Sequence, residues 1–236
     1  MPLLSVIVPT YNESGNIIRL SKAIGKAFSG VDYEVVFIDD NSQDNTAAII
    51  RSLPGFGRTI KLLERSGKLG LASAVAAGAK KARGKWIIVM DADLSHPPQT
   101  ARVLFDNRGS EGIVIASRNG NGGKKNLSVQ RDLFSRGAEL LAKPFVNGST
   151  ADPLSGFFLL KRDILTRTNI MVKGYKILLN ILYDNPELAV TDIPYTFYAR
   201  HSGKTKLDLR EILNYPADLM RLIIPSQVNL LDENIR

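Results

Sequence analysis

Residues 85–98 read KWIIVMDADLSHPP, an apolar run followed at once by two acidic residues and then by a pair of prolines. Trp86 to Met90 is short, unbroken and rich in β-branched residues, which predicts a strand buried on both faces. The run ends in Asp91-Ala92-Asp93. Because side chains alternate along a strand, both carboxylates leave the same face, at the strand end where open α/β sheets bind ligands. We expect Asp93 to lie at an exposed strand end and not in the core.

Asp91 and Asp93 are the predicted ligands of a divalent metal ion. Two carboxylates this close repel each other unless a cation lies between them, and Mg²⁺ or Mn²⁺ held by carboxylates and substrate phosphates is the usual arrangement. The alternative is that both residues begin a polar loop and cap the helix that Pro97-Pro98 starts. These two residues alone favour neither interpretation, but the rest of the chain favours the metal.

Composition limits the classes of protein to consider. The 236 residues, 44% of them hydrophobic, suffice for one α/β domain with a C-terminal appendage. A net charge of +8 favours anionic partners, namely phosphates, nucleic acid or a membrane face, although a basic surface without a specific partner is the alternative. The absence of cysteine excludes disulfides, thiolate chemistry and zinc fingers. Residues 1–9 are too short and too weakly basic for a signal peptide, and no transmembrane segment is expected.

Apolar runs and helical patterns alternate along the first half of the chain. The runs predict strands at residues 3–8, 33–38, 59–63, 86–90 and 112–117. Helical patterns lie between them, including a small-residue segment at 70–82 and a segment at 97–107. This alternation predicts an α/β fold in which a mostly parallel sheet has helices on both faces.

The pattern changes after Arg118. Residues 119–126 are glycine-rich and basic, and they predict a mobile loop beside the site. Further on we expect a helix at 127–145, a strand at 157–160, a helical segment at 177–182, an extended stretch at 189–198 and a last helix at 207–224. The last helix has apolar residues at helical spacing among basic ones, so it either covers the sheet or lies on a membrane surface.

Two common nucleotide-binding motifs are absent. A dinucleotide-binding enzyme requires Gly-x-Gly-x-x-Gly after its first strand, but this turn reads Pro9-Thr-Tyr-Asn-Glu-Ser-Gly15. Gly67-Lys-Leu-Gly70 does not have P-loop spacing. Nucleic acid is not an expected partner, because carboxylates at strand ends repel a phosphate polymer unless metal intervenes.

Three strand ends carry polar turns: Pro9-Thr-Tyr-Asn-Glu13, Ile38-Asp-Asp-Asn-Ser42 and Asp91-Ala-Asp93-Leu-Ser-His-Pro-Pro98. Together they resemble the nucleotide-sugar glycosyltransferases of family 2, which have the GT-A fold. Later segments resemble the dolichol-phosphate mannose synthase branch: Ser117-Arg118, Arg131, Ser135, Asp152-Pro-Leu-Ser-Gly-Phe157, Gly174-Tyr-Lys-Ile177 and Arg200-His-Ser-Gly-Lys-Thr-Lys206. The resemblance extends from residue 3 to about residue 215.

The resemblance implies a GT-A (Rossmann-like) three-layer domain at residues 1–206, followed at 207–236 by an amphipathic helix and tail that would associate with a membrane. It implies transfer of mannose from GDP-mannose to a polyprenyl phosphate, with inversion, by a peripheral protein at the cytoplasmic face of a membrane. One alternative is a glucosyltransferase that uses UDP-glucose. Another is a non-catalytic or nucleotidyl-transferring protein on the same scaffold.

The expected site residues come from the same resemblance. The donor would contact Pro9, Tyr11, Glu13, Ile38, Asp40, Asp91, Ala92, Asp93, Arg118, Arg200 and Lys206. The acceptor phosphate would lie on Arg118, Arg131 and Ser135, and the residues expected to act in catalysis are Asp91, Asp93, Arg118 and Arg131. Tyr11 as ordinary packing and Lys206 as a solvated charge remain alternatives.

Two positions depart from the branch. Ser95 stands where glutamine is common, which would leave a shorter oxygen near the metal, and Asn180 stands where an acidic residue is frequent. No general base is expected, since a phosphate monoester with a second pKa of about 6 is already charged at pH 7. Asp152 is therefore given a structural or orienting role. His96 and His201 are each expected to be polar surface residues, with a role as a ligand as the alternative.

Overall fold

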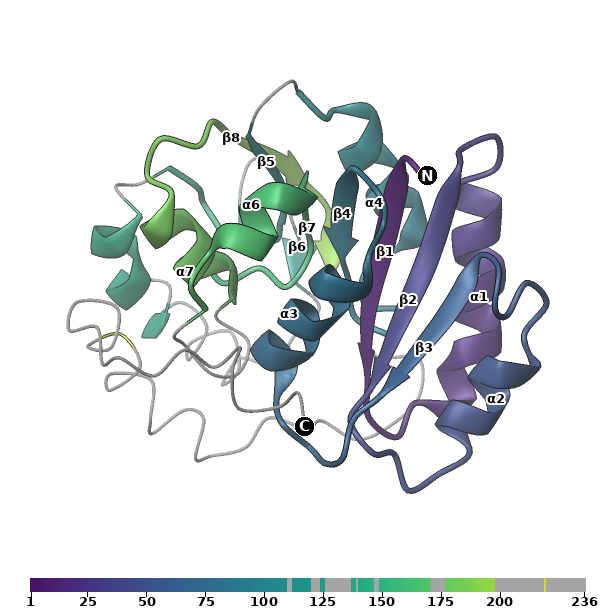
Figure 1. Cartoon of the computed structure of the whole chain (residues 1–236). Helices are drawn as coiled ribbons and strands as arrows, with labels where there is room; N and C mark the ends of the chain where they lie inside the picture. The colour runs from purple at the N-terminus through teal and green to yellow at the C-terminus, as the bar shows by residue number, and fades with distance from the viewer. Residues whose placement is uncertain are drawn as a thin grey trace.

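The computed structural model describes residues 1–109, 112–119, 124–125, 137–138, 140–146, 149–170, 177–197 and 219. The strands of its central sheet are β1 Leu4–Thr10, β2 Tyr33–Asp39, β3 Ile60–Glu64, β4 Trp86–Val89, β5 Ile113–Ser117, β7 Phe158–Lys161 and β8 Val190–Pro194. The seven strands lie in the order β3-β2-β1-β4-β7-β5-β8 (Figure 1). β7 runs antiparallel to β4 and β5, and the other pairs of this sheet are parallel, so the predicted mostly parallel sheet is confirmed.

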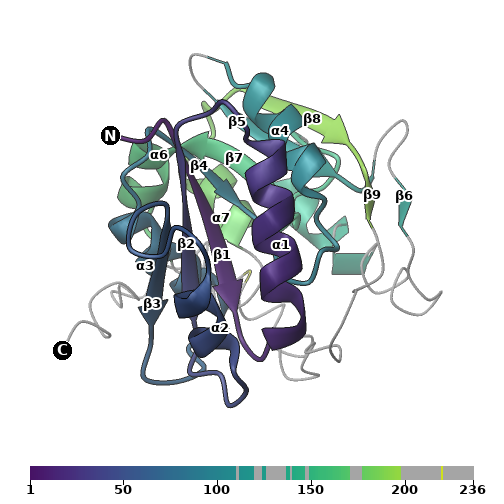
Figure 2. The same ribbon diagram turned by 90° about the vertical axis from the view of Figure 1, so that its right-hand side faces the viewer.

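Helices cover both faces of the sheet and give the three layers of a GT-A fold. They are α1 Ser14–Ala27, α2 Thr46–Ser52, α3 Leu71–Lys81, α4 Pro98–Asp106, α6 Arg162–Arg167 and α7 Ile177–Asp184, with a 3₁₀ turn at η1 Lys143–Phe145. α1, α2 and α4 lie on one face, and α3, α6 and α7 lie on the other (Figures 1 and 2). The predicted arrangement of layers is thus confirmed.

The core divides into two clusters, one on each face of the sheet. Val6 and Val8 of β1 pack in the cluster of the α1 face, whereas Ile7 between them packs in the cluster of the α3 face. This strand is therefore apolar at successive positions, as expected for a strand buried on both sides. In α3 the absence of a side chain at Gly78 allows close packing, because a Cβ there would lie 2.7 Å from Cδ1 of Ile38 and 2.8 Å from Cγ2 of Ile7. The helix consequently packs close to the sheet.

The second half of the chain departs from the prediction at two places. Lys124–Lys125 forms a short strand, β6, paired with β9 Thr196–Phe197, so the expectation that 119–126 forms no regular element is wrong at these two residues. Pairing with a strand far along the chain cannot be read from local composition. α6 was not predicted, because its six residues are too few to show a helical period.

The expected C-terminal helix at 207–224 and the boundary between residues 206 and 207 lie outside the described residues, apart from Leu219. Leu219 is buried in the core cluster of the α3 face, so this position does not face a membrane. Among the residues that the structure describes, no helix is both long and apolar enough to cross a bilayer.

Candidate active site

Three turns that carry acidic residues meet at one edge of the sheet. β2, β1 and β4 are adjacent and parallel, so their carboxyl ends lie side by side, toward the lower side of the sheet in Figure 1. The turn after β1 contains Tyr11 and Glu13, β2 ends at Asp39 and is followed by Asp40, and the Asp91–Asp93 pair follows β4. We call this the carboxyl edge. Parallel topology alone therefore brings together the acidic turns that the sequence places far apart.

The first two turns are joined by hydrogen bonds. The backbone N–H of Asn12 donates to Ser42 Oγ at 2.8 Å, and the N–H of Gln43 donates to Asn12 Oδ1 at 2.8 Å. Asn12 has a φ of 53°, a left-handed conformation that asparagine tolerates better than most residues. The Nζ of Lys68 lies 5.1 Å from the centre of the half-buried Tyr11 ring. These contacts hold the predicted donor-binding turn in a defined shape.

The Asp40 carboxylate is hydrogen-bonded to the loop that precedes α3. One of its oxygens accepts from Arg65 Nε at 2.6 Å, and the other accepts the backbone N–H groups of Leu69 and Gly70, each at 3.1 Å. Burial raises the pKa of Asp40 even though the Arg65 contact opposes this shift. Its predicted contact with the donor remains a prediction, and the described contacts position the loop that precedes α3.

The side chain of Ile38 packs in the hydrophobic core. It is fully buried against Gly78, so this predicted donor residue does not present its side chain at an open surface. Glu13 is also buried, and its Oε2 accepts from Asn16 Nδ2 at 2.7 Å. Pro9, which is half-buried, and the buried Ala92 lie at the ends of β1 and β4, at the edge where the donor is expected.

Asp91 and Asp93 differ in their surroundings. The side chain of Asp91 is 36% exposed, whereas Asp93 is only 3% exposed, so the expectation of an exposed strand end is wrong for Asp93. The chain turns back at Leu94, whose φ is 64°, and this brings Ser95 onto Asp93. Ser95 donates to Asp93 Oδ1 from both Oγ, at 2.6 Å, and its backbone N–H, at 3.0 Å. The two carboxylates supply the hard oxygen ligands that Mg²⁺ and Mn²⁺ prefer, so these residues fit a divalent cation.

His96 is buried, and the expectation of a surface histidine is therefore wrong. Its ring stacks on Phe157, with centres 4.7 Å apart and an angle of 12°, and meets Tyr195 and Phe197 edge-on. Its Nδ1 accepts the backbone N–H of Asp91 at 3.0 Å. Burial lowers the pKa of His96, and the charge of Arg118 acts in the same direction, although nearby carboxylates oppose the shift.

Arg118 follows β5 at the same edge and forms an ion pair with Asp152. Its Nε donates to Asp152 Oδ2 at 2.8 Å and its Nη2 donates to Oδ1 at 2.7 Å. Asp152 is fully buried, and its backbone N–H donates to Thr150 Oγ1, which in turn donates to Asp192 Oδ1 at 2.7 Å. These contacts agree with the structural role expected for Asp152.

Several predicted residues lie outside the described residues. These are Arg131, Ser135, Arg200, Lys206 and His201.

Asn180, where related proteins often have an acidic residue, is fully buried in α7. Its Nδ2 donates to the carbonyl oxygen of Asn169 at 3.0 Å, so the asparagine side chain makes a structural contact. The sequence reasoning did not single out Arg65. The available signal was its position, since it is a basic residue directly after the third strand in a chain whose neighbouring strands end in acidic residues.

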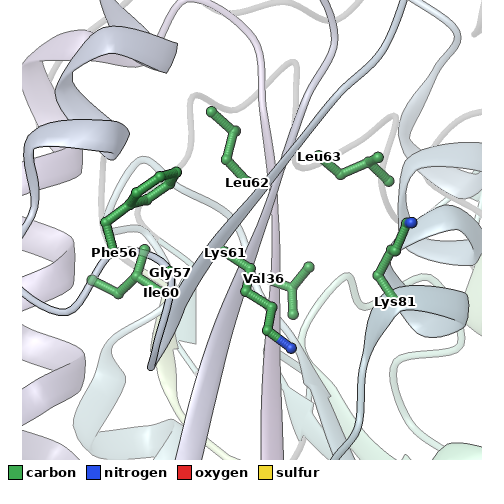
Figure 3. A pocket seen from close by; sticks show the side chains of 8 residues that line it. All are labelled: Val36, Phe56, Gly57, Ile60, Lys61, Leu62, Leu63 and Lys81. Carbon is green, nitrogen blue, oxygen red and sulfur yellow. The ribbon is translucent and has the colours of Figure 1, made fainter.

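A separate hollow of about 340 Å³ lies beside the edge strand β3 (Figure 3). Its lining is mostly apolar, with Val36, Phe56 and Leu63, and it includes Lys61 and Lys81. Of the predicted site residues that the structure describes, none lines it. Its described lining contains no carboxylate, so it is distinct from the site that the acidic strand ends form.

Comparison with known proteins agrees with this geometry. The profile of Glycosyl transferase family 2 matches residues 5–168. Dolichol-phosphate mannosyltransferases of Pyrococcus furiosus, Saccharomyces cerevisiae and Mycosarcoma maydis are 38%, 34% and 33% identical to this chain. The matches cover 93%, 93% and 94% of this chain and 63%, 86% and 79% of the relatives, so the chain spans less than two thirds of the Pyrococcus furiosus protein.

Solved structures support the fold. Glucosyl-3-phosphoglycerate synthase from Mycobacterium tuberculosis has a TM-score of 0.70 at 20% identity in complex with phosphoglyceric acid. In complex with Mn²⁺, UDP-glucose and phosphoglyceric acid it has a TM-score of 0.67 at 19% identity. Both matches cover 95% of this chain and 81% of the solved one. The chain belongs to glycosyl transferase family 2, in the branch whose curated members are dolichol-phosphate mannosyltransferases.

Proposed function

We propose that this chain is an inverting mannosyltransferase that moves mannose from GDP-mannose to a polyprenyl phosphate of the dolichyl type. The observation that carries the proposal is the meeting of three acidic strand ends at one edge, in a chain more than 30% identical to dolichol-phosphate mannosyltransferases. The names of these relatives support the sugar and the acceptor, whereas the guanine base of the donor rests on the resemblance of the motifs.

Asp91 and Asp93 would hold Mg²⁺ or Mn²⁺ together with the donor diphosphate. When bound, this ion supplies positive charge to the diphosphate that leaves the sugar. Ser95 holds Asp93 Oδ1 in place through two hydrogen bonds. A serine at this position therefore orients a ligand, a role that does not require the longer glutamine.

Arg118, with Arg131 and Ser135, would hold the acceptor phosphate in line with the anomeric carbon. The pairing with Asp152 uses two of the five N–H donors that a guanidinium carries. It also fixes the plane of the Arg118 side chain. Because the acceptor phosphate is already an anion, the site needs positive charge and orientation, and it needs no group that removes a proton.

We place the reaction at the cytoplasmic face of a membrane, with the protein bound peripherally. A polyprenyl tail stays in the bilayer, so the enzyme must reach its acceptor there. The net charge of +8 favours an anionic lipid surface. Co-sedimentation with vesicles that contain anionic lipid should therefore fall as salt is raised, and binding that is indifferent to salt and to lipid charge would contradict this placement.

A product assay tests the proposed activity. The protein is incubated with a short polyprenyl phosphate and either GDP-mannose or UDP-glucose, with Mn²⁺, with Mg²⁺ or with EDTA, and the lipid is analysed by mass spectrometry. The expected product is a polyprenyl phosphate that carries one hexose from GDP-mannose. Hexose from UDP-glucose alone would identify a glucosyltransferase, and transfer of nucleotide without sugar would reject glycosyl transfer.

A further inference from the structure

His96 has a ring that the fold holds in one orientation. Phe157 lies parallel to it, and Tyr195 and Phe197 meet it with their edges at centre distances of 6.1 and 6.0 Å. The residue is only 3% exposed. Tyr195 and Phe197 come from the end of β8 and from β9, so residues late in the chain determine where this ring lies beside the end of β4.

The ring of His96 binds the backbone of Asp91 through one nitrogen. Nδ1 accepts the Asp91 backbone N–H at 3.0 Å, which means that Nδ1 carries no proton and that Nε2 carries it in the neutral ring. Nε2 lies 3.8 Å from Oδ2 of the Asp91 carboxylate.

The contact with Nδ1 occurs where the sheet no longer supplies an acceptor. The Met90 N–H still donates to the carbonyl oxygen of Ile7, across the pair formed by β1 and β4. The next N–H, that of Asp91, donates to His96. A buried N–H that loses its partner costs stability, so an acceptor is needed at this point, and a purely space-filling ring would not provide one.

We propose that His96 is a positioning residue that orients Asp91 for the divalent cation. Nδ1 fixes the backbone from which the Asp91 side chain departs. Ser95 fixes the Asp93 carboxylate directly, so neighbouring residues of the same turn preset both members of the carboxylate pair. The inference rests on the proposed function only in naming the cation, because the contacts of His96 exist in the protein itself.

Nitrogen NMR tests the predicted tautomer without any ligand. The chain has two histidines, so the ring signals of His96 are those that disappear in His96→Asn. Long-range ¹H–¹⁵N spectra at pH 7.5 should show an unprotonated Nδ1 and a protonated Nε2 for His96. A protonated Nδ1 would overturn the proposal, whatever reaction the enzyme catalyses.

Binding measurements test the positioning role. His96→Phe keeps an aromatic ring but has no acceptor, whereas His96→Asn places an amide oxygen near the position of Nδ1. Calorimetry with Mn²⁺ and GDP should show about tenfold or greater weakening in His96→Phe and no more than about threefold weakening in His96→Asn. Circular dichroism of each variant checks the fold.

Wild-type affinity in folded His96→Phe would overturn the proposal. So would a loss in folded His96→Asn that equals the loss in His96→Phe. If His96→Phe does not fold, His96→Asn alone decides, because tenfold weakening there means that a retained acceptor does not suffice. Failure of the wild-type protein to transfer mannose would reject the proposed function and leave the tautomer and the Mn²⁺ measurements standing.

Discussion

The two edges of the sheet both bury carboxylates, but in different ways. At the amino edge, which we define by Ser5, Glu34, Lys61 and Arg83, the Glu34 carboxylate accepts from Ser5 Oγ at 2.7 Å, from the Arg83 N–H at 2.6 Å and from Lys61 Nζ at 2.7 Å. Burial alone would raise the pKa of Glu34, yet these hydrogen bonds lower it. At the carboxyl edge the pKa of Asp40 is raised, because burial outweighs the opposing contact with Arg65.

This difference distinguishes carboxylates whose charged form stabilises the folded state from carboxylates whose charged form is disfavoured by burial. The surroundings of Glu34 favour its charged form, so the residue contributes stability at neutral pH. Among the described residues, the non-glycine positions with positive φ are Asn12, Asn41 and Leu94, and all three follow strands at the carboxyl edge. Backbone strain and disfavoured charge gather at functional sites, because selection there acts on chemistry and stability is supplied elsewhere.

The largest expected effect is that of Asp93→Asn. Turnover should fall by about 100-fold or more, because one of the two predicted metal ligands loses its charge. Stability in urea should change by less than about 1 kcal/mol, since the amide oxygen can still accept from Ser95. Product formation and calorimetry with Mn²⁺ and GDP measure the first effect. Unchanged turnover and unchanged binding of Mn²⁺ and GDP would mean that Asp93 only caps the loop.

Glu34→Gln should show the opposite pattern at the amino edge. We expect a loss of about 2 kcal/mol in the free energy of unfolding at pH 7, with turnover unchanged, because a buried charge pair is weakened far from the strand ends that we propose bind substrate. Glu64→Gln is the matched control, since the Glu64 side chain is 48% exposed and its pair with Arg51 should contribute little.

The pH dependence of this loss follows from the lowered pKa of Glu34. A carboxyl group whose pKa is lower in the folded state contributes stability above its unfolded pKa and loses that contribution as pH falls through the folded value. Urea unfolding at several pH values should therefore show wild type and Glu34→Gln converging below about pH 4.5. A gap that is constant with pH would mean that packing, and not charge, explains the loss.

Asp152→Asn should lower turnover by about tenfold. The amide retains one accepting oxygen for Arg118 but loses the charge that holds the guanidinium, and a charge-assisted contact is worth roughly 1.5 to 3 kcal/mol. The pH profile of the rate should keep its shape. The rate should rise through the second pKa of the acceptor phosphate, which is about 6, and then stay constant. Complete loss of turnover with both substrates still bound would make Asp152 a general base.

Local sequence patterns predicted the strands and the acidic turns. Each strand from β1 to β5 is an apolar run bounded by turn residues, and this signal depends only on neighbouring residues. The meeting of Glu13, Asp40 and Asp91 at one edge then follows from parallel pairing. The fold and the acidic half of the site were for this reason within reach of the sequence.

What the sequence did not predict depends on contacts between distant segments. Residues 158–161 contain no sign that β7 inserts between β4 and β5 in the antiparallel direction. His96 resembles a polar loop residue until Phe157, Tyr195 and Phe197 enclose it from positions about 60 to 100 residues later. The sequence of a turn shows which polar groups it contains, but only the tertiary structure shows which residues bury them.

Tyr195→Phe should have the smallest effect and the opposite sign. Tyr195 is 5% exposed, and its hydroxyl oxygen has no hydrogen-bond partner among the residues that the structure describes, so burying it lowers the stability. Removing the oxygen keeps the ring that meets His96 and Phe157, and the free energy of unfolding should rise by about 1 kcal/mol.

Urea unfolding measures this gain, and Tyr183→Phe is the control, because Tyr183 is exposed and its hydroxyl can be solvated. A loss of stability in Tyr195→Phe alone would mean that the hydroxyl is paired in solution. A gain accompanied by weaker binding of Mn²⁺ and GDP would extend the contrast between the two edges. The carboxyl edge would then bury a hydroxyl that has no partner among the described residues and that pairs with a bound ligand, whereas the amino edge satisfies the buried Glu34 carboxylate with its own donors.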